Sequence, residues 1–215
     1  MTKPTTEDRI KVALDHGLTK EYFIDFLKSL LENARYADEK FQRSIFLLLL
    51  SMLAFEFLLR ASIPEASIGP FKLTDLSPLQ KFTPVVVAYF YYSTSSLGVM
   101  RRYLVISIES IIKIFYQPAW DNYFSYLQLP PSSFVVEELI DQYSKGLFSK
   151  VRRFMQAIIA FTVLIMPLAF EVYAYYQCFY RFGIKDFFTW ASLAASIPML
   201  VGAVGIVYHF LQEME

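Results

Sequence analysis

The chain has 215 residues, of which 55% are hydrophobic and 18% aromatic, and its 20 basic and 20 acidic side chains give a formal net charge of zero. This length allows one compact domain with a short appendage, and the apolar share exceeds that of soluble proteins. The lack of a basic surplus argues against a nucleic-acid partner, and the single cysteine, Cys178, argues against an intrachain disulfide or a cysteine metal cluster.

Two helices are predicted in the N-terminal region, residues 1–43. Thr6 and the acidic residues after it are typical of the start of a short helix that ends near His16. From Lys20 to about Leu59 apolar residues recur at a helical period, and no Gly or Pro interrupts them. This pattern predicts one long cytoplasmic helix that continues into the first membrane span. The polar, acidic start has no apolar stretch of the kind found in signal peptides.

The long helix carries an apolar stripe outside the membrane, which includes Phe23, Leu27 and Leu30. Such a face needs a covering surface, and the central loop, a second copy of the chain or a cytoplasmic protein partner can supply it. We therefore expect these residues to form an interaction surface. Trp120, in an aromatic stretch of the central loop, is a candidate for a second one.

Four segments are long and apolar enough to cross a bilayer core of roughly 30 Å as helices. They run from about Ser44 to Ile63, from Phe82 to Met100, from Phe154 to Tyr180 and from Phe187 to Leu211. The sequence thus predicts an all-α polytopic membrane protein. Its four-helix transmembrane domain covers residues 44–215 and contains a helical cytoplasmic insert at 101–153. A soluble protein with four buried helices is the alternative.

Basic residues set the expected orientation. Eight precede the first span, three lie in the first loop, seven between spans two and three, and two in the last loop. By the positive-inside rule, both termini and the central loop face the cytoplasm, and we expect the membrane to be a bacterial inner membrane. The pairs Arg101-Arg102 and Arg152-Arg153 fall at the cytoplasmic ends of spans two and three, where such side chains extend towards the interface.

The central insert is expected to be helical at both ends. The run from Leu104 to Ile112 continues span two as a helix, and the stretch from Phe134 to Tyr143 is typical of another helix. Prolines between these two stretches mark breaks.

Two acidic residues lie inside predicted spans and end the same tetrapeptide, Leu-Ala-Phe-Glu. They are Glu56 and Glu171, 115 residues apart, which indicates either a duplicated two-helix hairpin or a coincidence in a chain rich in Leu and Phe. An ionisable group in hydrocarbon is costly and marks a functional site by default, here a site for a cation or a proton. The structural alternative is a pair of carboxyls that only hold helices together.

Span two holds further polar candidates. Tyr89 lies at a depth similar to that of Glu56, so a hydrogen bond between them is sterically feasible, and Tyr91 is close by. Ser93 and Thr94 either line a pore or bond back to helix carbonyls. In span four, small residues predict close packing against another helix. These include Ala191, Ala195, Gly202, Ala203 and Gly205.

The sequence has no motif for an enzyme, a cofactor or a metal. His16 and His209 lack metal-ligand spacing, and there is neither a phosphate-binding glycine loop nor a nucleophile motif. We therefore expect a non-enzymatic protein without cofactor or metal. The layout, four spans with cytoplasmic helices, resembles small bacterial membrane effectors and channel-forming proteins at the level of fold.

The leading expectation is a homo-oligomeric inner-membrane protein that forms a pore, or perturbs the membrane, under cytoplasmic control. Because four spans enclose little volume, such a conduit would form between subunits. The first alternative is a small secondary transporter built on the duplicated hairpin. The second is a membrane scaffold that docks a cytoplasmic protein.

Overall fold

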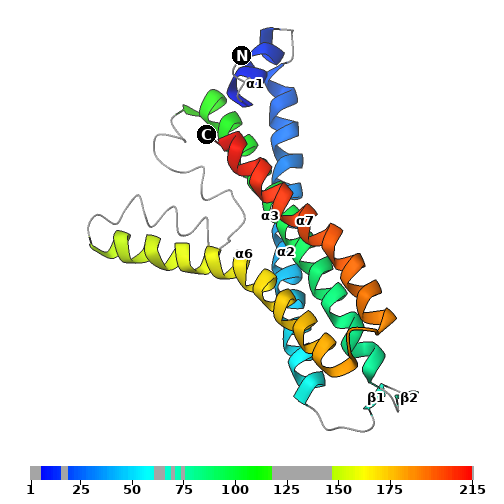
Figure 1. Cartoon of the computed structure of the whole chain (residues 1–215). Coiled ribbons are helices and arrows are strands. Elements are labelled where there is room, and N and C mark those ends of the chain that lie inside the picture. Colours follow the sequence, from blue (N-terminus) through cyan, green and yellow to red (C-terminus); the bar gives the residue numbers. More distant parts are fainter. Residues whose placement is uncertain are drawn as a thin grey trace. The chain divides into compact units, whose positions relative to one another are not determined.

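The computed structural model describes residues 6–15, 19–60, 66–68, 71–73, 76–117 and 147–214. Within these ranges the chain is almost entirely helical, which confirms the all-α class. The helices are α1 Thr6–Asp15, α2 Lys20–Arg60, α3 Ser77–Phe115, α6 Leu147–Phe182 and α7 Phe187–Met214 (Figure 1). The sequence analysis does not predict the small antiparallel hairpin that β1 Ala66–Ile68 and β2 Phe71–Leu73 form. Trp120 and the helix predicted at Phe134 to Tyr143 lie outside the described residues.

The long N-terminal helix is present as predicted, because α2 runs without a break for 41 residues. Thr19 precedes it, and its hydroxyl accepts a hydrogen bond from the backbone N–H of Tyr22 at 3.4 Å, as an N-cap residue does. The extension of the second predicted span is also present. α3 continues to Phe115, well beyond Met100, so that one helix of 39 residues includes the run from Leu104 to Ile112.

A buried proline inside α3 explains one contact between helices. Pro84 has no N–H, so the carbonyl of Gln80 one turn earlier loses its helical partner. The Cys178 thiol of α6 donates to this carbonyl across 3.9 Å. The side-chain amide of Gln80 donates in turn to the carbonyl of Leu58 at 2.6 Å, in the last turn of α2. Backbone groups that lack a helical partner are thus satisfied by side chains of neighbouring helices.

The chain divides into two compact units. Unit 1 comprises Met1–Lys40 and Leu97–Arg153, and unit 2 comprises Phe41–Ser96 and Phe154–Glu215. The helices α2, α3 and α6 contribute to both. This division groups the N-terminal region with the segment that follows the second predicted span, whereas the sequence analysis assigned the two to separate domains.

Unit 1 has an apolar core and a charged exterior, as soluble helical proteins have. The core combines Ile10 of α1 with the stripe on α2 and the end of α3, and contains Phe23, Leu27, Leu30, Ala34, Val105, Ile108, Ile111 and Ile112. The expected apolar stripe is therefore covered by the chain itself. One buried ion pair joins the same helices, with 2.7 Å between Arg101 Nε and an oxygen of Asp38. Arg101 thus turns into unit 1 instead of extending outwards as expected, because Asp38 offers it a carboxylate there.

Unit 2 has the opposite distribution of polarity. Its four helices carry large apolar side chains on their outer faces, including Phe46, Leu50 and Phe57 of α2, Val86 of α3, Phe161 and Val172 of α6, and Val201 of α7. Its interior contains buried polar side chains beside the apolar ones. These are Ser44, Ser51, Gln80, Thr83, Thr94, Glu171, Thr189, Ser192 and Ser196. An apolar exterior around a partly polar interior is the arrangement expected of helices surrounded by lipid.

Two helices of the described chain are long and apolar enough to cross a membrane, namely Glu21–Arg60 in α2 and Phe187–Phe210 in α7. The sequence analysis predicts four spans, and α3 and α6 do not meet this test of length and composition. In α3 the reason lies in its tyrosines and in the Ser93 to Ser96 cluster, which lower the mean hydropathy. In α6 part of the span has no described side chains.

Candidate functional site

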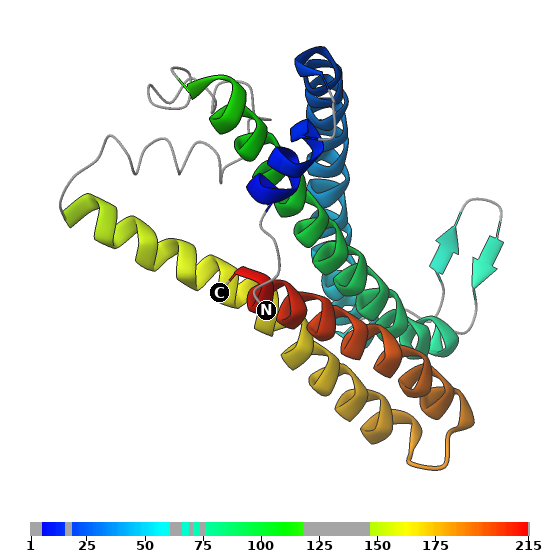
Figure 2. The same ribbon diagram turned by 90° about the horizontal axis from the view of Figure 1, so that it is seen from above.

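The helix ends of unit 2 define its two ends. The C-terminal ends of α2 and α6 and the N-terminal ends of α3 and α7 lie together at one of them (Figures 1 and 2). We call this the Asp186 end, and the opposite one the Ser44 end. Glycine closes α6 there: Gly183 has a φ of 84° and donates to the carbonyl of Phe179 at 3.0 Å, an αL termination.

Glu171 is the most unusual group in the interior of unit 2. It is 2% exposed and lies on a buried stripe of α6 with Ala174, Tyr175 and Cys178. Neither carboxylate oxygen has a hydrogen-bond partner among the described residues. The backbone of Ala88 in α3 approaches the carboxyl without reaching hydrogen-bond geometry. A buried carboxyl without a partner is rare, because its charge is costly to desolvate.

A cluster of buried hydroxyls lies one turn closer to the Asp186 end. The Tyr175 hydroxyl is 2.7 Å from Ser196 Oγ and 3.1 Å from Ser192 Oγ, and Ser192 donates to the carbonyl of Lys81 at 2.7 Å. Thr189, Ser192 and Ser196 share the buried face of α7 by their helical spacing. Tyr175 interacts electrostatically with Glu171, which stands one turn before it on α6.

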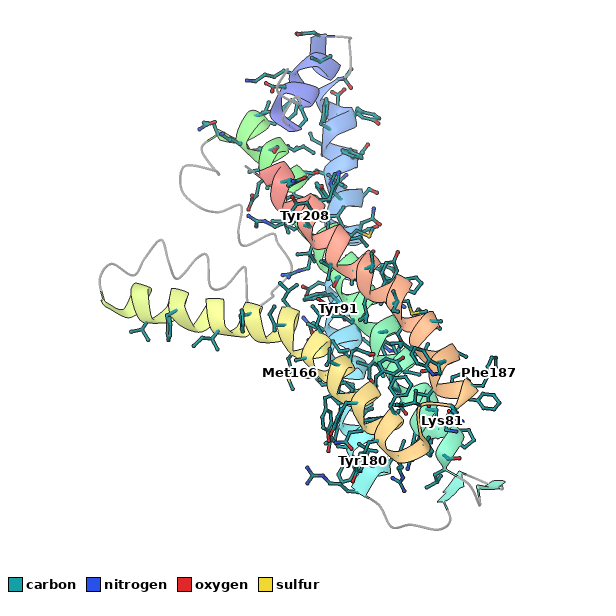
Figure 3. All side chains as sticks on the ribbon, viewed as in Figure 1. Lys81, Tyr91, Met166, Tyr180, Phe187 and Tyr208 are labelled. Atoms are coloured by element: carbon teal, nitrogen blue, oxygen red, sulfur yellow. The ribbon has the colours of Figure 1, made fainter. Side chains whose placement is uncertain are left out.

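At the Asp186 end, an ion pair joins Lys81 of α3 to Asp186, the residue that precedes α7. Lys81 Nζ lies 2.7 Å from Asp186 Oδ1, and the side chains are 12% and 17% exposed. The ammonium also lies 4.4 Å from the ring centroid of Phe182, a cation–π contact. Asp186 Oδ2 accepts hydrogen bonds from the backbone N–H and hydroxyl of Thr189, so Asp186 caps α7. The Lys81 hydrogen bond, with those from Thr189, lowers the pKa of Asp186 to about 2. Figure 3 labels Lys81 at this end.

On the other side of Glu171 the interior is mainly apolar. Leu48, Met52, Val87 and Ala203 form a cluster with Tyr91, whose hydroxyl donates to the carbonyl of Leu164 at 2.9 Å. We call this cluster the apolar layer. Beyond it, at the Ser44 end, Ser44 and Thr94 share a hydrogen bond of 2.9 Å. Glu171 therefore lies between a polar cluster and an apolar layer.

The second intramembrane candidate, Glu56, has different surroundings. Its side chain is 28% exposed and lies 3.3 Å from Arg60 Nε, one turn later on α2. Its tyrosine partner is Tyr173 of α6, whereas Tyr89 is exposed. Tyr173 thus takes the position beside Glu56 that the similar depth of Tyr89 made feasible for Tyr89, because α3 turns Tyr89 outwards.

The two Leu-Ala-Phe-Glu segments nevertheless meet. The rings of Phe55 and Phe170 stack edge to face with 5.5 Å between their centroids, so α2 and α6 are in contact at this tetrapeptide. The two tetrapeptides are 115 residues apart, and a similar offset of 114 residues relates Pro84 to Pro198. These prolines differ in their surroundings, since Pro84 is buried and Pro198 is exposed.

The other residues that the sequence singled out as candidates belong partly to unit 2 and partly to unit 1. Tyr91 and Thr94 lie in the interior of unit 2, and Ser93 is half-buried. Phe23, Leu27 and Leu30 belong to the core of unit 1.

Sequence reasoning did not single out the polar side chains that line the interior towards the Asp186 end: Lys81, Tyr175, Asp186, Thr189, Ser192 and Ser196. A signal was available for some of them. Asp186 followed three residues later by Thr189 is typical of a helix N-cap, and the hydroxyls at 189, 192 and 196 repeat at helical spacing. Lys81 gave no such signal, because its partner is 105 residues away.

Within the described residues, no group of three or more His, Cys, Asp or Glu side chains is placed to hold a metal ion. Comparisons of the chain with protein-family models, curated proteins and solved structures find no match.

Proposed function

We propose that this protein is a secondary transporter that spans a membrane with α2, α3, α6 and α7 and moves a proton or small cation across it on Glu171. The observation that carries this proposal is a buried carboxyl with no hydrogen-bond partner in the described part of the chain, inside a helical unit with an apolar exterior. Such groups in membrane proteins mark ion pathways and proton relays. The contact between the two Leu-Ala-Phe-Glu segments fits the hairpin repeats found in transporters.

The exposure of the apolar helices supports a membrane setting. Only 22% of the most apolar window of α2, and 17% of that of α7, is buried inside the protein. A core helix of a soluble protein would be mostly buried. Trp190 and Tyr208 are both exposed and stand about 27 Å apart along α7 at 1.5 Å per residue. This matches a hydrocarbon core of roughly 30 Å with an aromatic residue at each interface.

Aromatic side chains also gather at the Asp186 end, as they do at a membrane interface. Tyr176, Tyr180, Phe187 and Phe188 are exposed there, and Figure 3 labels Tyr180 and Phe187. The alternation of basic residues along the chain directs this end to the outside and both termini to the cytoplasm. A bacterial inner membrane is the setting that we propose.

Flux into liposomes tests the function. The purified protein is reconstituted with proton-, Na⁺- or K⁺-sensitive dyes inside, and each gradient is imposed in turn. We expect saturable flux of one ion, reduced at least about tenfold in Glu171→Gln, which keeps the size of the side chain and removes its ionisation. Glu32→Gln, an exposed carboxyl in unit 1, is the matched control. Wild-type protein that moves no ion under any gradient contradicts the proposal.

A homo-oligomeric pore is the second candidate. It is favoured by Glu56, which is partly exposed on the outer face of α2, beside the exposed Leu53 and Phe57. A conduit between copies would be lined by such outward carboxyls. Glu171 lies inside a single chain and would not line it. The liposome assay separates the two functions, because a pore predicts non-saturable flux that depends on Glu56 and not on Glu171.

A further inference from the structure

The groups around Glu171 restrict what it can bind. Metal cations such as Ca²⁺ or Mg²⁺ need six or more oxygen ligands in a suitable geometry. Among the described residues, no other carboxylate influences Glu171 electrostatically, no group of three potential metal ligands is present, and the nearby Tyr175 hydroxyl is already engaged by Ser192 and Ser196. Two carboxylate oxygens are too few for a desolvated cation, whereas a proton needs only one.

We infer that the carried species is a proton, which binds to Glu171 and reaches it from the Asp186 end through the hydroxyls of Tyr175, Ser192 and Ser196. This inference rests on the proposed function. In each cycle a hydronium ion at the Asp186 end gives up a proton, each relaying hydroxyl receives one proton and passes one on, and one O–H bond forms at a carboxylate oxygen of Glu171. That bond breaks when the proton passes to water on the opposite side of the membrane, and the hydroxyls are left as they began. No electrons are exchanged, so no oxidant or co-reactant is needed.

The polarity of the interior gives the direction of access. Between Glu171 and the Asp186 end lie three buried hydroxyls, the cap at Thr189 and the Lys81–Asp186 ion pair. Between Glu171 and the Ser44 end lies the apolar layer, where no described hydroxyl bridges Glu171 to the Ser44–Thr94 pair.

On the Ser44 side the Tyr91 hydroxyl is bonded to the Leu164 carbonyl and the Ser51 hydroxyl to the Leu48 carbonyl, so neither leads to Glu171. The hydroxyls on the Asp186 side are bonded to one another, which favours proton access from that side. Glu171 must move to complete this route, because no hydrogen bond joins its carboxyl to the Tyr175 hydroxyl in the structure. Transport then requires the apolar layer to open.

The orientation of the hydroxyls shows which movement proton transfer needs. Ser192 donates to the carbonyl of Lys81, so its oxygen is free to accept from Tyr175, and Tyr175 in turn can accept from Ser196. A carbonyl passes no proton on, so the Ser192 hydroxyl must rotate away from it during transfer. Hydroxyl rotation is a soft motion that leaves the helices in place.

Two other ionisable groups, Tyr175 and Cys178, interact electrostatically with Glu171, and further ionisable groups stand on the helices around it. Tyr175 and Cys178 stand on the same face of α6, Tyr91 and Lys81 come from α3, and Asp186 precedes α7. On α2, Glu56 is paired with Arg60 at the outer face. The Lys81–Asp186 pair is neutral as a whole, so the carboxyl of Glu171 is the group near the centre of unit 2 that exchanges charge with its surroundings.

Two variants test the route without removing Glu171. Tyr175→Phe and Ser196→Ala delete one hydroxyl each and keep the packing of the ring and the helix. Thr83→Val is the matched control, because Thr83 is a buried hydroxyl near the same end that bonds back to the Leu79 carbonyl of its own helix. We expect proton flux to fall by about tenfold in the first two variants and to be unchanged in the third.

The readouts distinguish the inference from the proposed function. Flux of Na⁺ or K⁺ without proton flux would support the proposed transport function but would contradict the proton as the carried species. Proton flux that is lost in the double variant Ser44→Ala/Thr94→Val but unaffected in Tyr175→Phe overturns the direction of access. If no ion crosses the membrane at all, both the proposed transport function and the inference of a carried proton are contradicted.

A chemical measurement covers variants that fold poorly. An apolar carbodiimide reacts with a protonated carboxyl in an apolar site, and mass spectrometry locates the adduct. We expect labelling of Glu171 in the detergent-solubilised full chain, unaffected by Na⁺ and decreasing as the pH rises. Protection by Na⁺, or no labelling at any pH, contradicts a proton on Glu171.

Discussion

Glu171 and Glu56 end identical tetrapeptides but differ in the groups around them. Glu56 is 28% exposed and paired with Arg60, which is 83% exposed. Glu171 is buried, and no described residue forms a hydrogen bond with its carboxyl. A true duplication would make the two carboxyls equivalent by descent, and the sequence alone predicts similar effects of their replacement. The structure predicts different effects.

We expect Glu56→Gln to lower the free energy of unfolding by less than about 1 kcal/mol, because exposed ion pairs contribute little. Glu171→Gln should also keep the fold, since the amide occupies the same space, but should stop transport. Thermal unfolding in detergent and liposome flux, measured on both variants, check this. Equal losses of flux in Glu56→Gln and Glu171→Gln would instead support the view that the two carboxyls are equivalent by descent.

The Lys81–Asp186 pair makes stability depend on pH in acid. The folded-state pKa of Asp186 is about 2, below the value of about 3.9 for an unperturbed aspartate. Its contribution to stability is therefore fully present above about pH 4 and is lost as the pH falls towards about 2.

Thermal unfolding of the wild type between pH 5 and pH 2 should show this loss. Asp186→Asn should be less stable than the wild type at pH 5 and should lose less on acidification, because it has no charge at either pH. An identical acid dependence in wild type and variant would assign the loss to other carboxyls.

At the scale of single helices, the small residues of α7 look alike in the sequence but differ in how closely they pack against other helices. A Cβ atom at Gly202 would lie 3.0 Å from the ring of Tyr92 in α3, whereas Ala195 is exposed. The sequence analysis predicts close packing at both. Of these two positions, Gly202 makes a close contact among the described residues and Ala195 presents an exposed side chain.

We expect Gly202→Leu to destabilise unit 2 by about 1–3 kcal/mol through overpacking. Ala195→Leu should leave the stability of the monomer unchanged. Unfolding of both variants in detergent decides the point, and equal stability would refute the α3–α7 contact. A change of oligomer size in Ala195→Leu alone would indicate that this face meets a second copy.

The first half of α2 is a core element of unit 1. Leu27 packs with the end of α3, so Leu27→Ala should cost about 2–5 kcal/mol, as truncations in helical cores do. Phe26, one residue earlier, is 42% exposed and stacks on Tyr22 at 6.2 Å, which makes Phe26→Ala the matched control. Chemical unfolding followed by circular dichroism should separate the two. Similar small losses in both would mean that a partner, and not α3, covers the stripe.

At the scale of the whole molecule, the helices were predictable because their signals are local. The uninterrupted apolar period of α2 and the run that extends α3 suffice to predict both helices. The polar interior of unit 2 was not predictable, since Ser192 meets Lys81 across 111 residues of sequence and Tyr175 meets Ser196 only once α6 and α7 pack. Glu171 itself was identifiable, because a carboxyl within an apolar run is unusual wherever the helix turns it.

Membrane topology tests the central claim most directly, because transport on Glu171 presupposes that all four helices of unit 2 cross the bilayer. In a Cys178→Ala background, single cysteines at Lys72, Lys185, Gln117 and Gln212 are probed in intact cells with a membrane-impermeant maleimide. The account predicts labelling at Lys72 and Lys185, and at Gln117 and Gln212 only after the membrane is permeabilised. Gln117 is decisive, because it lies between the second and third predicted spans. Labelling there in intact cells would leave only α2 and α7 as spans and would contradict the account.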